Sequence, residues 1–362
     1  MMMCKPISIQ EPLTRDELLD WLREEDEARL SQLWARADAV RAENVGDQVH
    51  LRGLVEISNH CRRRCMYCGL RSENRRITRY RMTLGEVLAC AHRAVALGYG
   101  TLVLQGGEDA ELNVEFIADM VHQIKQETGL AVTLSLGERA PEELAAWKSA
   151  GADRYLLRFE TSDKDLYRMI HPARPGQTLE RIELLRSLQR LGYEAGSGIM
   201  VGIPGQTYES VADDILLFRE LDLDMIGIGP YIPHPHTPLG SGEWRRDIDR
   251  ADQVPGSERM VYKAIALARL MCPQANIPAT TALATINRRN GRELGLMRGA
   301  NVVMPNLTPP KYRALYEIYP DKACVNETAE ECGGCLRRRI QSIGRSVGMG
   351  PGGRNRRRVE VS

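Results

Sequence analysis

Three closely spaced cysteines are the residues of this chain whose types most clearly indicate chemistry. Cys61, Cys65 and Cys68 stand in the run Cys-Arg-Arg-Arg-Cys-Met-Tyr-Cys, just after a segment, 51–57, that predicts a strand. Clustered cysteines in a large chain are typical of metal sites rather than disulfides. A [4Fe–4S] cluster held by three cysteines leaves one iron open to a small molecule, whereas structural zinc normally takes four protein ligands. The spacing therefore favours an iron–sulfur cluster over zinc.

A second group of cysteines lies near the end of the chain. Cys324, Cys332 and Cys335 have the spacing Cys-x7-Cys-x2-Cys, which again is typical of metal ligands. This group fits an auxiliary iron–sulfur cluster or a zinc ion, with one position left for water or an external group. The first cysteine motif is sufficient to hold a [4Fe–4S] cluster with an open iron. We therefore expect the second site to be accessory.

Alternating strand and helix patterns position the first motif. Helical patterns separate eight segments that predict strands, at 51–57, 101–105, 131–136, 153–158, 196–202, 224–229, 276–281 and 300–304. This α/β alternation predicts a complete (β/α)8 TIM-type barrel over residues 51–310. A helical stretch at 14–43, opened by the capping box of Thr14 and Glu17, belongs to an N-terminal extension, 1–50, expected to cover the barrel floor. A cysteine-bearing segment, 311–362, follows.

Polar residues gather where these predicted strands end. Barrel enzymes keep their active sites at the carboxyl ends of the strands, and side chains two apart share one face. The candidates at these ends are Gly106, Gly107, Glu108, Thr133, Ser135, Arg158, Glu160, Thr280 and Thr281. Arg158 and Glu160 also fit an internal salt bridge, since a buried charge requires a partner. His234 and His236, in a proline-rich loop, fit a ligand role and a structural role equally.

Composition restricts the partners. The formal net charge is +1, so no global field favours nucleic acid or an acidic membrane. No stretch approaches the roughly 20 apolar residues that a transmembrane helix needs, and the N-terminus lacks an apolar signal region. We therefore expect a cytoplasmic protein without membrane or nucleic-acid partners.

The first motif closely resembles the signature of the radical S-adenosylmethionine (SAM) superfamily. In that superfamily, SAM binds the open iron and is cleaved reductively to a 5′-deoxyadenosyl radical. From about Leu51 to about Val359 the chain further resembles the HydE family of [FeFe]-hydrogenase maturases. The resemblance rests on stretches such as SNHCRRRCMYCGLRSEN, VLQGGED, TLSLGE, DRYLLRFET, GYEAGSGIMVGIPGQT, DMIGIGPYIPHPHTPL, NIPATTAL and ANVVMPNLTP, and on the three cysteines of the tail.

The resemblance implies a role in assembling the diiron part of the hydrogenase active site. Its substrate would be an iron–cysteine complex bearing CO and cyanide, supplied by the maturase HydG, and its product would pass to the scaffold HydF. Reduced flavodoxin or ferredoxin would donate electrons. The resemblance also implies an auxiliary [2Fe–2S] or [4Fe–4S] cluster at Cys324, Cys332 and Cys335.

Individual residue roles follow from the same resemblance. The expected SAM contacts are Tyr67, Gly106, Gly107, Glu108, Ser135, Arg158, Glu160 and Arg181. The expected lining of the substrate cavity is Thr133, Met225, Thr280, Thr281 and Tyr312.

Three alternatives stay open. Methylornithine synthase shares this type of fold but as a rule lacks the tail cluster. Biotin synthase shares the barrel and the first motif, but it holds its second cluster inside the barrel. A non-enzymatic iron–sulfur carrier would also explain two cysteine groups, but it would release its cluster readily and ignore SAM.

Overall fold

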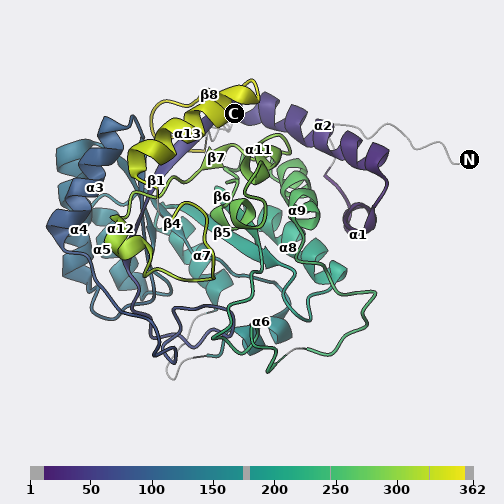
Figure 1. Cartoon of the computed structure of the whole chain (residues 1–362), viewed down its shortest axis with the longest axis horizontal. Helices are drawn as coiled ribbons and strands as arrows, with labels where there is room; N and C mark the ends of the chain where they lie inside the picture. Colours follow the sequence, from purple (N-terminus) through teal and green to yellow (C-terminus); the bar gives the residue numbers. More distant parts are fainter. Residues whose placement is uncertain (1–11, 174–179, 245, 326, 355–362) are drawn as a thin grey trace, which may run out of the picture.

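A ring of parallel strands forms the centre of the molecule (Figure 1). The computed structural model describes residues 12–173, 180–244, 246–325 and 327–354. The strands lie in the order β6-β5-β4-β3-β2-β1-β7, and every pairing is parallel. Their bounds are β1 (Gln48–Ser58), β2 (Thr101–Gly106), β3 (Ala131–Ser135), β4 (Arg154–Leu156), β5 (Glu194–Val201), β6 (Met225–Pro230) and β7 (Val302–Val303). The predicted α/β TIM-like fold is confirmed.

The ring closes between β6 and β7 through residues 276–278, which form isolated bridges rather than a continuous strand. Asn276 forms a single parallel bridge with Met225 of β6, and Pro278 forms one with Val302 of β7. The prediction of a strand over 276–281 was therefore too long. Proline offers no N–H for a continuous ladder, and the Thr280 side chain caps the next helix by accepting from the N–H of Leu283.

Helices follow the strands around the outside of the ring (Figure 1). A capping box of Thr83 and Glu86 opens α3, and Gly129 in left-handed conformation ends α4. The helices are α3 (Leu84–Ala96), α4 (Val114–Thr128), α5 (Pro141–Ser149), α6 (Lys164–Ile170), α7 (Arg181–Arg190), α8 (Tyr208–Glu220), α9 (Glu258–Met271), α10 (Thr281–Ile286), α11 (Gly291–Leu296) and α12 (Pro310–Arg313).

The N-terminal extension forms two helices rather than one. α1 (Arg15–Arg23) opens with the predicted capping box of Thr14 and Glu17. α2 (Glu27–Val45) begins anew at Asp26, whose side chain accepts from the N–H of Arg29. α1 packs against α8 and α9, and α2 packs against α9. They therefore lie largely along the side of the barrel, where floor coverage had been expected.

The C-terminal segment closes the floor instead. α13 (Ala329–Ser342) leads to β8 (Ser346–Val347), which pairs with the first residues of β1. Beyond β8, the Pro351 carbonyl accepts from Thr101 Oγ1 at 2.9 Å, and the Gly352 carbonyl accepts from Arg52 Nη2 at 2.9 Å. The tail thus covers the amino ends of the strands and leaves the opposite end for the site. None of the described helices is both long and apolar enough to cross a membrane.

Candidate functional site

An internal cavity of about 320 Å³ extends along the inside of the barrel. Because successive strand side chains point to opposite faces, residues two apart share the inward face. The cavity wall follows this rule with Arg52, Leu54 and Glu56 on β1, Val103 and Gln105 on β2, and Thr133 and Ser135 on β3. Regular strand geometry therefore brings the polar side chains of separate strands around one space.

The loop after β1 carries the first cysteine motif and is fixed to four other parts of the barrel. Cys65 is buried, and Cys61 and Cys68 are half-buried. Main-chain hydrogen bonds join this loop to Glu108, Ile170, Leu239 and Ile318. Tyr67, which lies in the same loop between Cys65 and Cys68, lines the cavity. The three thiols are thus held on a braced loop beside the cavity.

Gly107 is needed for this loop to pack against the end of β2. A Cβ atom at position 107 would lie 2.1 Å from the His60 carbonyl oxygen and 2.8 Å from Cys61 Cβ. The Glu108 N–H, one residue further on, donates to Cys61 Sγ at 3.4 Å. The segment Gly106–Glu108 therefore supports the cysteine loop from behind, and only Gly106 of these three residues lines the cavity.

Burial and nearby cations govern the thiols. Burial raises the pKa of Cys65 to about 12, and it raises the pKa of Cys61 as well. The pKa of Cys68 is raised by burial first and then by the charges of Cys65 and Cys61, which shows that the three thiols interact. The guanidinium of Arg181 acts in the opposite direction on Cys65. Metal binding here must displace thiol protons, as it does at thiolate sites generally.

Most of the expected SAM contacts meet in the cavity wall. They are Tyr67, Gly106, Ser135, Arg158, Glu160 and Arg181, whereas Gly107 and Glu108 lie behind the cysteine loop. Glu160 Oε2 lies 3.3 Å from Arg158 Nη2, so the ion pair considered from the sequence is present. Glu160 has a φ of 66°, which is strained for a residue with a side chain. Such strain is concentrated at functional sites.

Several buried polar atoms of the cavity wall have no hydrogen-bond partner within the described part of the chain. They are Thr133 Oγ1, Glu160 Oε2 and the Nε atoms of Arg52, Arg158 and Arg292. A buried donor or acceptor without a partner costs on the order of 1–3 kcal/mol. A polar ligand would supply these partners, so the wall fits a ligand with carboxylate, hydroxyl and amino groups, such as SAM.

A network of charges behind the wall was not predicted from the sequence. Glu138 accepts from Arg181 Nε at 2.8 Å and lies 3.3 Å from Arg63 Nη1. The two ring nitrogens of His171 face the same two guanidinium groups. Burial, then Arg181 and Arg63, holds the His171 pKa well below its usual value, so the ring is neutral. No local pattern could predict this contact among four separate segments, which fixes Arg181 relative to the cysteine loop.

Four of the five expected substrate residues line the cavity: Thr133, Met225, Thr280 and Thr281. Tyr312 does not. Its ring stacks on Tyr80 with centroids 4.5 Å apart, and its hydroxyl donates to Glu86 at 2.9 Å, at the start of α3. Several further residues of the wall were not predicted from the sequence, namely Arg52, Glu56, Arg292, Tyr316, Tyr319 and Lys322. Two charged residues four positions apart, and therefore on one face of the apolar strand 51–57, were the signal for Arg52 and Glu56.

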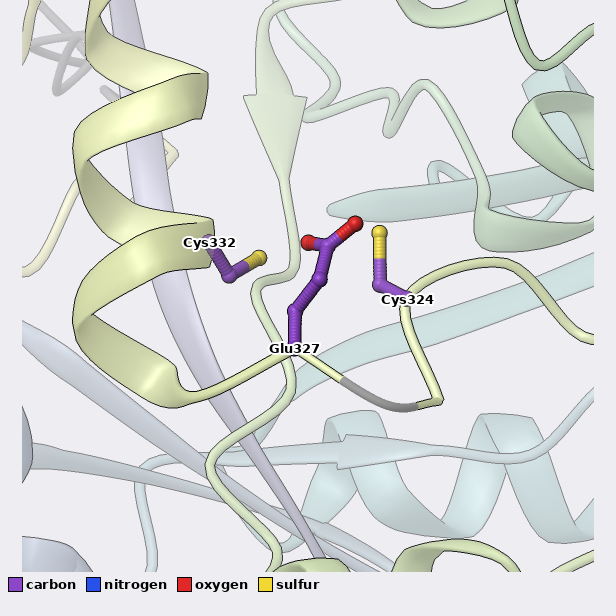
Figure 2. Close-up of side chains that lie close together, drawn as sticks. All are labelled: Cys324, Glu327 and Cys332. Atoms are coloured by element: carbon purple, nitrogen blue, oxygen red, sulfur yellow. The ribbon is translucent and has the colours of Figure 1, made fainter.

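The C-terminal cysteines come together only in part. The donor atoms of Cys324, Cys332 and Glu327 all lie within 4.8 Å of one another. Figure 2 shows the Glu327 carboxylate pointing toward the space between the two sulfur atoms. Cys335 lines the same cavity, of about 130 Å³, but is not one of these three donors. Glu327 was not predicted from the sequence as a ligand.

Known proteins with similar sequences agree with this geometry. Residues 55–218 match the model of the Radical SAM superfamily. The chain is 46% identical over 344 residues to the [FeFe] hydrogenase maturase subunit HydE of Thermotoga maritima, covering 95% of this chain and 94% of that protein. It is 30% identical to 3-methylornithine synthase of Methanosarcina barkeri, covering 82% of this chain and 80% of that protein.

A solved structure shows the same fold. The structure of methylornithine synthase (PylB) matches with a TM-score of 0.79 and 26% sequence identity, and the match covers 94% of this chain and 95% of that one. The identity to HydE is higher than the identity to either methylornithine synthase and extends over nearly the whole chain. With its cysteine loop beside a polar barrel cavity, the chain belongs to the HydE family of radical SAM enzymes.

Proposed function

We propose that this protein cleaves SAM reductively and acts on an iron–cysteine complex bearing CO and cyanide during assembly of the [FeFe]-hydrogenase diiron cluster. The observation that carries the proposal is the juxtaposition of the braced cysteine loop with a cavity wall whose buried polar atoms lack partners. The 46% identity to HydE of Thermotoga maritima supports the same reading.

Cys61, Cys65 and Cys68 are the residues that would hold the [4Fe–4S] cluster. When bound, that cluster supplies the electron for cleavage of SAM to methionine and a 5′-deoxyadenosyl radical. The thiols fit this role because they share one loop and interact with one another. Arg79 and Arg181 place positive charge near them, which opposes the effect of burial and lowers the cost of forming the thiolates.

The cavity wall provides complementary groups for SAM. Arg158 and Glu160 present opposite charges 3.3 Å apart, which suits the carboxylate and the amino group of the methionine part. Ser135 offers a hydroxyl on the inward face of β3, and Tyr67 adds an aromatic surface from the cysteine loop. The Arg63–Glu138–Arg181 contacts keep this side of the wall in place.

The charge of the whole wall fits an anionic substrate. Its cationic side chains are those of Arg52, Arg158, Arg181, Arg292 and Lys322, and its carboxylates are those of Glu56 and Glu160. A cyanide-bearing complex with a cysteine carboxylate carries negative charge, so a wall with more cations than carboxylates favours its binding. Thr133 Oγ1 is a free hydrogen-bonding group deep in this wall.

The proposal includes partners that supply and receive the complex. They are HydG as supplier, HydF as acceptor, and reduced flavodoxin or ferredoxin as electron donor. The family resemblance also predicts an auxiliary [2Fe–2S] or [4Fe–4S] cluster at Cys324, Cys332 and Cys335. That cluster stays a prediction, because Cys335 lies outside the compact group of donors at this site.

An anaerobic turnover experiment tests the function. The protein is reconstituted with iron and sulfide and mixed with SAM and dithionite, and 5′-deoxyadenosine and methionine are measured with and without the iron–cysteine–CO–cyanide complex. Cleavage that rises with the complex and consumes it supports maturation. Cleavage indifferent to the complex keeps the SAM chemistry but contradicts this substrate, and no cleavage from a loaded cluster indicates a carrier.

A further inference from the structure

The C-terminal donor group is built around one point rather than around an extended cluster. Two thiols and one carboxylate, from Cys324, Cys332 and Glu327, have their donor atoms within 4.8 Å of one another (Figure 2). We infer that this group binds a single divalent ion of intermediate softness, such as Zn²⁺, with Glu327 as a ligand.

The distances support a single ion. Zinc binds thiolate sulfur at about 2.3 Å and carboxylate oxygen at about 2.0–2.2 Å, so two of its ligand atoms can be no more than about 4.6 Å apart. All three donor atoms lie within 4.8 Å of one another. This limit is close to the largest separation that zinc allows, even before the side chains shift to bind the ion. Two thiolates and a carboxylate are also a ligand set that zinc accepts and iron–sulfur clusters rarely use.

Cys335 argues against the three-thiolate cluster that the family implies. Its thiol contacts the guanidinium of Arg339, one helical turn further along α13. Arg339 itself is held by Glu293, with Nη2 donating to Oε2 at 2.9 Å. Cys335 lines the cavity of about 130 Å³ beside the donors. Cys335 can therefore serve as a fourth ligand of a zinc ion. An iron–sulfur cluster held by three cysteines would instead require Cys335 as its third thiolate.

The donors are placed by contacts that do not depend on a metal. Arg313 is buried, and its Nη1 donates to the carbonyls of Cys324 at 3.1 Å and Glu327 at 2.5 Å. Cys324 has a φ of 62°, an uncommon conformation that Arg313 helps to hold. At the other side, Thr328 and Glu331 form a capping box that fixes the start of α13, which carries Cys332. The loop is therefore organised in advance around the ion position.

The charges at this site balance. Two thiolates and one carboxylate offset a divalent ion and one further positive charge. That charge is present, because Arg292 Nη1 lies 3.6 Å from Cys324 Sγ. Arg292, Ala323 and Cys324 also line the main barrel cavity. An ion bound here would join the loop before α13 to the helix and so stabilise one wall of the cavity.

Metal binding by the full-length protein tests the inference, and it does not depend on whether the proposed turnover occurs. The protein with its reconstituted [4Fe–4S] cluster is titrated with Zn²⁺ against a chelator, and the zinc site is examined by X-ray absorption. We expect one zinc per chain with sulfur at about 2.3 Å and oxygen at about 2.0 Å. Glu327→Gln should weaken zinc binding by on the order of tenfold or more, since even outer-shell changes have effects of that size.

The matched variants separate the ion from a cluster. Glu330→Gln, a neighbouring change on α13 at a residue paired with Arg93, should leave zinc affinity unchanged. Cys335→Ser should retain bound zinc, and Glu327→Asp should retain more affinity than Glu327→Gln if the variant folds. Each variant must load its [4Fe–4S] cluster as evidence of folding. The inference is overturned if wild type binds no zinc, if Glu327→Gln binds zinc as wild type does, or if iron and sulfide form a second cluster that Cys335→Ser abolishes.

Discussion

Lys322 Nζ lies 2.7 Å from Glu56 Oε1, with only 6% and 2% of the two side chains exposed. Glu56 stands near the end of β1, and Lys322 belongs to the segment between α12 and α13. The pair is further satisfied by Asn306 Nδ2, which donates to Glu56, and by the Tyr316 carbonyl, which accepts from Lys322. This buried ion pair fastens the C-terminal segment across the cavity, which both residues line.

Lys322→Met should strongly destabilise the fold. Removing the ammonium leaves the Glu56 carboxylate buried without its cation, and breaking a buried pair in this way typically costs about 3–5 kcal/mol. A urea titration of the variant and wild type gives the change in the free energy of unfolding. Adding Glu56→Gln to Lys322→Met should recover most of the loss, because the uncompensated charge is gone.

Lys311→Met provides the matched control, since Lys311 pairs with Glu86 at the surface and its side chain is 64% exposed. That variant should unfold at nearly the same urea concentration as wild type. Equal urea midpoints for Lys322→Met and Lys311→Met would show that the buried pair contributes no special stability.

Gly107→Ala should displace the cysteine loop. The added Cβ would meet the His60 carbonyl oxygen at 2.1 Å, and neither backbone can move without disturbing Cys61. A displacement of about 1 Å in reacting groups typically costs a hundredfold in rate, so 5′-deoxyadenosine formation should fall by about that factor. Gly85→Ala is the control, because nothing lies within 4 Å of its Cβ position in α3. Full activity in both variants would contradict the close packing.

The sequence predicted the barrel well because its signals are local. Strand patterns, helix caps and Cys61-x3-Cys65-x2-Cys68 depend on residues a few positions apart. The exception is 276–281, where Pro278 and the capping role of Thr280 shorten the strand to isolated bridges. The spacing of apolar residues alone did not distinguish a continuous strand from isolated bridges in this segment.

The candidate site was predicted less completely because its wall is assembled over long range. Lys322 and Glu56 are 266 positions apart, so no pattern in the sequence pairs them. Tyr312 and Tyr316 are four positions apart, yet only Tyr316 lines the cavity. Tyr312 belongs to α12, whereas Tyr316 lies in the turns after this helix ends at Arg313, so the two rings face different ways. Which side chains of the C-terminal segment line the cavity therefore depends on how this segment packs against the barrel.

Asp214 should make stability depend on pH. Its side chain is fully buried in α8, and burial raises its pKa from 3.8 to about 7. The folded state therefore binds a proton that the unfolded state releases above its pKa of 3.8, so stability falls as pH rises from about 4 toward 7. The slope is about 1.4 kcal/mol per pH unit. Asp214→Asn keeps the acceptor for the Ser162 N–H and should remove this loss.

Urea titrations of wild type and Asp214→Asn at pH 5.5 and pH 8 measure the effect. Between these values wild type should lose about 2 kcal/mol relative to the variant, since the loss stops near pH 7. A constant difference between the two proteins would mean that Asp214 is ionised in the folded state throughout this range.

Tyr316→Phe and Tyr312→Phe should differ in their effect on turnover. The Tyr316 hydroxyl accepts from Gln105 Nε2 at 3.2 Å in the cavity wall, and Tyr316 as a whole is 2% exposed. Losing one hydrogen bond of about 1 kcal/mol there should raise the KM for the iron–cysteine complex about fivefold. Tyr312→Phe loses only the contact with Glu86 and keeps its stacking on Tyr80, so kcat and KM should match wild type. The reverse result, with Tyr312→Phe raising KM and Tyr316→Phe silent, would place Tyr312 in the wall during turnover and require the C-terminal segment to rearrange when substrate binds.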